Sequence, residues 1–87
     1  MQDSTESFTA FPIPVTGNLT VKWVSDEANP LQILQIHTVE GQLLFQRKIE
    51  SKRGQINLDF SGYIRGMYIL TGINADGKTH VVKIIHQ

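Results

Sequence analysis

The residue types of a nucleophilic triad are all present in this chain. His37 could act as the base, Asp59 as its orienting acid and Ser61 as the nucleophile. These types occur in almost any domain, however, and the residues around Ser61 lack the pattern of the strained turn that exposes a catalytic serine in hydrolases. We therefore predict that the chain is not an enzyme and has no catalytic residues.

Two histidines near the end of the chain are of a type that binds metal ions. His80 and His86 have the same strand phase. Six residues of strand span about 20 Å, whereas two ligands of one zinc ion each lie about 2 Å from it. The chain also has no cysteine, so no thiolate site is available. We predict no metal site and no cofactor.

A group of basic residues surrounds the turn predicted at residues 51–54 and could bind phosphate. Its members are Arg47, Lys48, Lys52 and Arg53, with Glu50 as the only acid among them. No aromatic stacking platform accompanies these cations, as a nucleic-acid surface would require. A solvated turn that keeps sheet edges soluble is the favoured interpretation, and no nucleic-acid partner is predicted.

Length and composition limit which elements can position a site. The chain has 87 residues, of which 40% are apolar, enough for one small domain with a single core. Its formal net charge of zero gives no indication of a nucleic-acid or anionic-membrane partner. The apolar runs are far shorter than the roughly 20 residues of a membrane-spanning helix. We expect residues 1–7 to be a flexible linker or a cloning remnant, and residues 8–87 to form the domain.

Alternating apolar and polar residues predict short strands at intervals of about ten residues. The expected strands or extended segments are residues 8–15, 19–24, 31–39, 43–49, 55–60, 67–73 and 78–85. Pro12 and Pro14 place the first segment at a sheet edge, and a bulge near Ile33 would reconcile apolar residues on both phases of the third. This spacing favours an all-β fold, an antiparallel β-sandwich of about seven short strands. An open barrel of similar strand count fits the spacing too.

The glycines and aromatic residues have expected structural roles. Gly41 is predicted in a hairpin turn, and Gly66 and Gly77 are expected to supply turn conformations that a Cβ atom disfavours. Trp23 and Tyr68 are expected in the core or at its edge.

Several short motifs occur in a characteristic order along the chain. They lie at residues 11–15, 18–21, 36–41, 58–62, 66–68, 76–78 and 83–85. This series, which covers about residues 8–87, resembles the type A C-terminal sorting domain of the type IX (Por) secretion system. Ile13 stands where that family usually has asparagine, and Thr38 where an acid or amide is common. The resemblance marks structural or recognition residues at Pro12, Pro14, Gly41, Gly62, Gly66, Tyr68, Gly77, Lys78, Lys83 and Ile84.

The resemblance implies an immunoglobulin-like sandwich and a function without catalysis. Such domains follow a secreted cargo, cross the inner membrane with it, fold in the periplasm, and are recognised by an outer-membrane translocon and its shuttle β-barrel. A sortase-like peptidase commonly removes the domain and leaves the cargo on the cell surface. The cleavage point is then expected in or before residues 1–10. We expect the translocon contacts on the last strand and the turn before it.

Other functions are compatible with a small sandwich. It could be an adhesion or carbohydrate-binding module in which Trp23, Tyr63 or Tyr68 stacks on sugar rings. Such a module needs these rings exposed on a common surface, whereas a sorting domain can bury them. A stand-alone periplasmic or secreted protein of the same fold is a further alternative. Edge strands would also allow strand addition or a homodimer.

Overall fold

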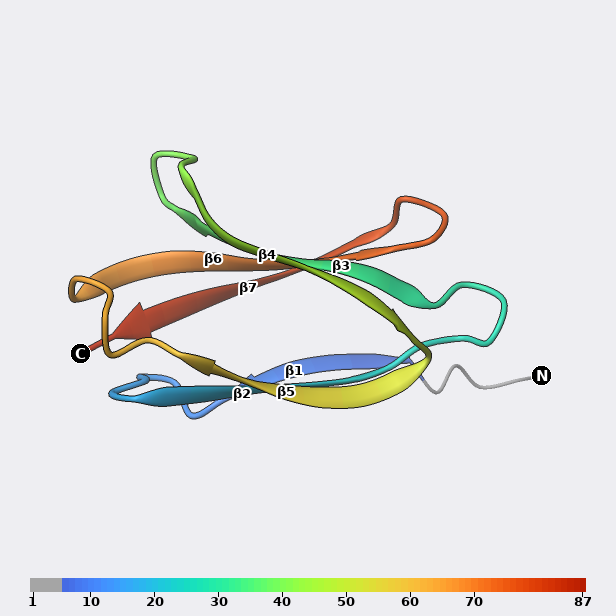
Figure 1. Ribbon diagram of the computed structural model, residues 1–87, viewed down its shortest axis with the longest axis horizontal. Coiled ribbons are helices and arrows are strands. Elements are labelled where there is room, and N and C mark those ends of the chain that lie inside the picture. Colours follow the sequence, from blue (N-terminus) through green and yellow to red (C-terminus); the bar gives the residue numbers. More distant parts are fainter. Residues whose placement is uncertain (1–5) are drawn as a thin grey trace.

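Seven strands make up most of residues 6–87, the part of the chain that the computed structural model describes (Figure 1). They are β1 (Ser7–Phe11), β2 (Asn18–Val24), β3 (Leu31–Thr38), β4 (Leu43–Ser51), β5 (Arg53–Asp59), β6 (Gly66–Asn74) and β7 (Thr79–His86). Residues 6–87 contain no helix, and hence none that is long and apolar enough to cross a membrane. The predicted all-β fold is confirmed.

The strands form two antiparallel sheets that lie one above the other (Figure 1). One has the order β1-β2-β5 and the other the order β4-β3-β6-β7. The connections from β2 to β3, from β4 to β5 and from β5 to β6 pass between the sheets, as in Greek-key sandwiches. The predicted seven-stranded sandwich is therefore confirmed, and the open barrel is excluded because the two sheets have separate strand orders.

The core lies between the two sheets and is built by their inner faces. On β2, Leu19 and Val21 are fully buried and Trp23 is 5% exposed, which confirms the predicted alternation. The opposite sheet contributes residues such as Leu34 and Leu70, both fully buried. Each such side chain contributes about 1.5–3 kcal/mol of hydrophobic free energy, which holds the two layers together.

Two local predictions for β3 and the turn after it are confirmed. The pairing of β3 with both neighbours shifts in register between Leu31 and Ile33, at the expected bulge. Gly41 has a φ angle of +99°, in the left-handed region that favours glycine, within the connection from β3 to β4.

The boundary between β4 and β5 was predicted wrongly. Residues 51–54 were expected to form a turn, but Lys52 is the only residue between the two strands, which belong to different sheets. The chain crosses here as a nearly continuous extended segment, because Ser51 still pairs with Leu31 in one sheet and Arg53 pairs with Val24 in the other.

At the start of the chain, β1 includes Ser7, one residue earlier than expected. Most of the predicted linker, residues 1–5, lies outside the described residues.

Candidate functional site

The proline segment, residues 12–15, meets the end of β7. The Val15 N–H donates to the Ile85 carbonyl at 2.8 Å, and the Gln87 N–H donates to the Val15 carbonyl at 2.9 Å. Val15 is fully buried, whereas Pro12 and Pro14 are exposed. The first and last motifs of the series therefore lie side by side and join the edges of the two sheets.

An aromatic cluster fills the same end of the sandwich. Phe60 is fully buried and makes edge-on contacts with Tyr63, Tyr68 and His86, at ring-centroid distances of 5.1, 5.7 and 5.7 Å. The Tyr68 hydroxyl donates to the Ile64 carbonyl. This bond near the start of β6 has the form of the tyrosine corner of immunoglobulin-like sandwiches. Burial raises the pKa of Tyr63, with a further contribution from Tyr68.

Tyr68 and Ile84 are thus structural residues. Tyr68 is 6% exposed and Ile84 is fully buried. Trp23, with 5% of its surface exposed, is also a core residue, as expected. Trp23 and Tyr68, two of the three rings that could have stacked on sugars, are therefore not accessible to a carbohydrate.

The motif glycines differ in what the backbone requires. Gly66 and Gly77 have φ angles of +149° and +91°, as expected for positions that a Cβ atom disfavours. Gly62 is exposed, its φ angle is not positive, and a Cβ atom added to it would meet nothing within 4 Å. The fold alone does not require glycine at position 62.

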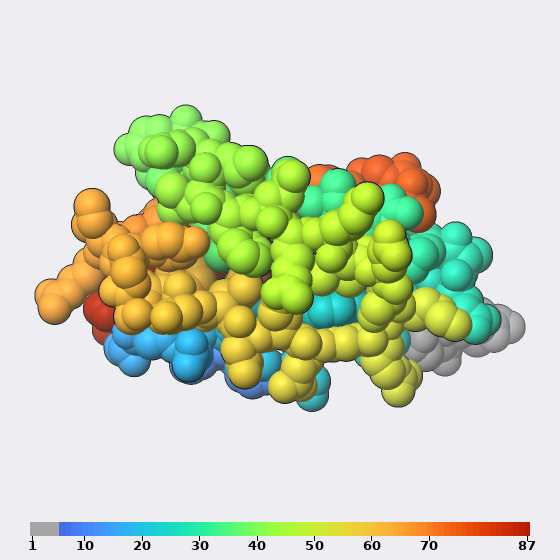
Figure 2. All heavy atoms as spheres, in the orientation of Figure 1, coloured from blue at the N-terminus to red at the C-terminus, as the bar shows by residue number. Residues whose placement is uncertain are grey.

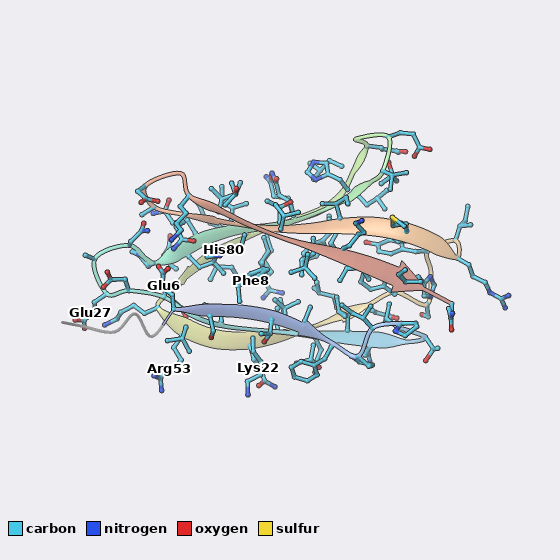
Figure 3. The ribbon with its side chains drawn as sticks, turned by 180° about the vertical axis from the view of Figure 1, so that it is seen from behind. Glu6, Phe8, Lys22, Glu27, Arg53 and His80 are labelled. Atoms are coloured by element: carbon cyan, nitrogen blue, oxygen red, sulfur yellow. The ribbon has the colours of Figure 1, made fainter. Side chains whose placement is uncertain are left out.

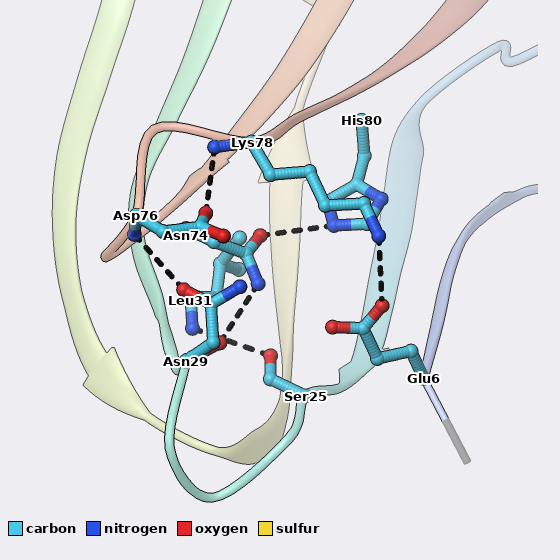
Figure 4. Close-up of polar contacts among 8 residues, drawn as sticks. All are labelled: Glu6, Ser25, Asn29, Leu31, Asn74, Asp76, Lys78 and His80. Carbon is cyan, nitrogen blue, oxygen red and sulfur yellow. Dashed lines mark hydrogen bonds and ion pairs between the residues drawn. The ribbon is translucent and has the colours of Figure 1, made fainter. Parts of the chain in front are cut away.

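A buried asparagine organises the turn between β6 and β7 (Figure 4). Asn74 is 2% exposed, and its Nδ2 donates to the Asn29 carbonyl at 2.8 Å. Its Oδ1 is therefore the atom that accepts from His80 Nε2, at 2.9 Å. The Asp76 N–H donates to Asn29 Oδ1, which ties this turn to the loop between β2 and β3. Local sequence patterns do not predict this network, because Asn29 and Asn74 are 45 residues apart.

Lys78 joins this turn to the start of the described chain. Its Nζ lies 3.3 Å from Glu6 Oε1, and the His80 ring stacks on Phe8 at 5.3 Å (Figures 3 and 4). The motif lysine at position 78 therefore helps to hold the segment that leads into β1 against the four-stranded sheet.

The outer face of β6 and β7 is partly apolar. Met67 and Ile85 lie opposite each other and are 43% and 37% exposed, while Val81 is 62% exposed. Lys83 is exposed on the same face, opposite Ile69. Of the motif residues on β7, Lys83 is accessible to a partner and Ile84 is not.

The triad residues are not assembled. His37 lies on β3 in the four-stranded sheet, whereas Asp59 ends β5 in the other sheet. The Ser61 hydroxyl and N–H both donate to Asp59 Oδ1, at 2.7 and 2.9 Å, and these bonds lower the pKa of Asp59. This arrangement is a local turn. Within residues 6–87, no three potential metal-binding side chains come together.

The basic group lies on β4, β5 and the crossover between them, and atoms of this segment cover much of the face shown in Figure 2. Lys52 Nζ lies 2.6 Å from Glu27 Oε2, and both side chains are largely exposed. This exposed pair lowers the pKa of Glu27, first through its hydrogen bond and then through the charge of Lys52. The arrangement is that of a solvated edge.

A comparison with known protein families gives a match that covers most of the chain. A family described as the secretion system C-terminal sorting domain matches residues 9–87. A search of curated proteins found no match for this chain. The matched residues include the proline segment, the aromatic cluster and all of β7.

Proposed function

We propose that this chain is a sorting signal, because it belongs to the family of C-terminal sorting domains of the type IX secretion system. Such a domain is a signal that directs an N-terminally attached cargo to the cell surface or the medium through that system, and the family is not in general catalytic. The observation that carries the proposal is the family match over residues 9–87, which includes nearly the whole described fold.

The finer role that we propose is that of a type A signal, with residues 8–87 as the sorting unit. Its cargo passes through the periplasm, and the domain is recognised by the outer-membrane translocon and its shuttle β-barrel. A sortase-like peptidase then removes the domain, and the cargo is joined to an anionic lipopolysaccharide. Two features of the fold support a signal of this kind. The core is closed by residues of this chain alone, and the motifs of its two ends meet at Val15.

Because the core is buried by residues of the domain itself, the domain can present the same surface to one receptor whichever cargo is attached to it. The accessible motif residues are the ones that can take part in such recognition. They include Pro12, Pro14, Gly62 and Lys83. Tyr68 and Ile84, being buried, can support recognition only by maintaining the fold.

The test is export of a reporter. The chain is fused behind a fluorescent protein that carries a periplasmic signal peptide, in a bacterium that has the type IX system. We expect the fluorescence at the cell surface or in the medium, and in the periplasm of a matched strain that lacks the translocon. Retention of the fusion in the periplasm of both strains would contradict the sorting role.

A second experiment tests whether the translocon contacts β7. Deleting residues 83–87 would also remove the fully buried Ile84 and so confuse recognition with unfolding. Lys83→Ala avoids this problem because the side chain is exposed. Lys22→Ala is the matched control, on β2 in the other sheet. We expect reduced export for the first and normal export for the second.

A further inference from the structure

β7 has a free edge. It is the last strand of the four-stranded sheet, and β6 is its only partner strand among the described residues. In an antiparallel pair, alternate residues direct both backbone groups toward the partner and the others direct them away. The Asn74 N–H donates to the Lys78 carbonyl, just before β7 begins. Because this alternation continues along the strand, the backbone N–H and C=O groups of the even-numbered residues of β7 point toward β6. The hydrogen bonds of Val15 with Ile85 and Gln87 agree with this assignment, because the backbone groups of these odd-numbered residues point away from β6.

The backbone groups of Val81 and Lys83 therefore point outward from the sheet. Among the described residues, no hydrogen bond meets these two N–H and two C=O groups. The parallel bridge between Val15 and His86 is isolated and does not continue back along β7. A stretch of edge centred on residues 81–83 is left with the donors and acceptors that an added strand requires.

The other three sheet edges are better guarded against pairing. β4 has three charged residues in its second half, and β5 has a charged residue at each end. β1 has only five residues and leads into the proline segment. Along β7, Lys83 is the only residue with a permanent charge, and Val81 is 62% exposed. Charges, short length and prolines are the usual protections of an edge, and β7 has the least of them.

We propose that this edge of β7 accepts an extended segment of the export machinery as an added β-strand. The inference rests on the sorting role and names the chemistry of its partner. The added segment would carry a carboxylate close to Lys83 and apolar side chains beside Val81 and Ile85. Figure 3, which views the molecule from behind, has β7 and β1 in front, away from the face covered by β4 and β5.

A second copy of the chain fits the edge less well. β7 contains no carboxylate, so pairing of two β7 strands leaves both Lys83 side chains without a counter-charge, and a register that sets residue 83 opposite residue 83 brings them together. Like charges close together across strands are destabilising. An acidic, extended segment of another protein satisfies both the backbone groups and the lysine.

The test removes one outward N–H without touching the core. Val81→Pro deletes a group that faces away from β6, at an edge position where proline is tolerated. Val81→Thr is the matched control, because it is also β-branched and keeps the N–H. The purified variants are bound to detergent-solubilised outer membranes of a type IX bacterium, and to those of a strain that lacks the translocon. Circular dichroism and thermal unfolding check that each variant is folded.

We expect Val81→Pro to bind translocon-containing membranes about tenfold more weakly than the wild type, and Val81→Thr, which keeps the N–H, to lose much less affinity. Lys83→Glu is a second variant that leaves the backbone intact, and its charge reversal is expected to weaken binding in the same assay. If Val81→Pro does not fold, this variant decides the question.

Equal binding of the folded Val81→Pro and Val81→Thr variants would overturn the inference. Sedimentation that shows a dimer lost only in Val81→Pro, with unchanged membrane binding, would assign the edge to a second copy and also overturn it. If the wild type and these variants are all exported normally, the edge inference fails and the sorting role stands. If the wild type itself is not exported, both fail.

Discussion

Gly72 lies in the interior of β6, where a side chain would collide with the core. A Cβ atom at this position would lie 2.6 Å from Phe8 Cε1 and 3.0 Å from Leu31 Cδ1. The Phe8 ring is in turn stacked on His80, at 5.3 Å. The ring therefore has little freedom to retreat, and Gly72→Ala is expected to destabilise the domain through overpacking.

The size of the effect follows from two opposing contributions. Forcing one extra carbon atom into a packed site costs about 1–3 kcal/mol. Replacing glycine by alanine within a strand returns roughly 0.5–1 kcal/mol, because the unfolded chain loses freedom. We expect the free energy of unfolding of Gly72→Ala to be lower by about 1–2 kcal/mol. For a domain of this size, that corresponds to a decrease in Tm of roughly 4–15 °C.

A double-mutant cycle measured by urea unfolding tests the reasoning. Phe8→Ala removes the ring, so adding Gly72→Ala to that variant is expected to cost close to nothing, and the two substitutions should couple by about 1 kcal/mol or more. Gly62→Ala is the control, because nothing lies within 4 Å of its added Cβ atom, and it should change stability by less than about 0.5 kcal/mol. An equal loss from Gly72→Ala in both backgrounds would refute the proposed collision.

Three further predictions concern single contacts. Tyr68→Phe leaves the Ile64 carbonyl without its donor, so unfolding free energy should decrease by about 1 kcal/mol; an unchanged thermal melt would contradict this role. Gly77→Ala places a side chain at a φ angle of +91° and should cost about 1–2 kcal/mol, again by thermal melting. Ser61→Ala removes the hydroxyl that lowers the pKa of Asp59, so a carboxyl-carbon NMR titration should show that pKa rising. A carboxyl with a lowered folded-state pKa stabilises the domain above its unfolded pKa of about 3.9, and this contribution disappears as the pH falls through the folded value. Wild type and Ser61→Ala should therefore differ near neutrality and converge in acid.

Local patterns in the sequence are sufficient to predict most of the strands. The alternation of Leu19, Val21 and Trp23 is visible because one face of β2 is buried and the other is not. The bulge near Ile33 is also predictable, since apolar residues on both phases cannot all face one core without a shift in register.

The crossover from β4 to β5 could not be predicted from local signals. Ser, Lys, Arg and Gly at residues 51–54 are typical of a turn. The extended crossover depends on pairing with residues distant in sequence, Leu31 and Val24, and a Cβ atom on Gly54 would lie 2.8 Å from Trp23 Cζ2. Gly54 is thus needed where the Trp23 ring covers β5, and the chain around it is extended.

The network around Asn74 was missed for a similar reason. Its partners come from the loop between β2 and β3 and from β7, and pairing of the strands has to precede any contact among them. The polar residues of this turn have ordinary hairpin composition, which gives no indication of a buried amide.

The residues that the resemblance marks are of two kinds, buried and exposed. Tyr68 and Ile84 are buried, so substitutions there affect export only through the stability of the sandwich. Gly62 and Lys83 are exposed, and replacing them leaves the core unchanged. An export defect that appears without a change in Tm therefore has to originate at the second kind of residue. Because a receptor can contact only exposed residues, Gly62→Ala and Lys83→Ala are the substitutions that distinguish an effect on recognition from an effect on folding.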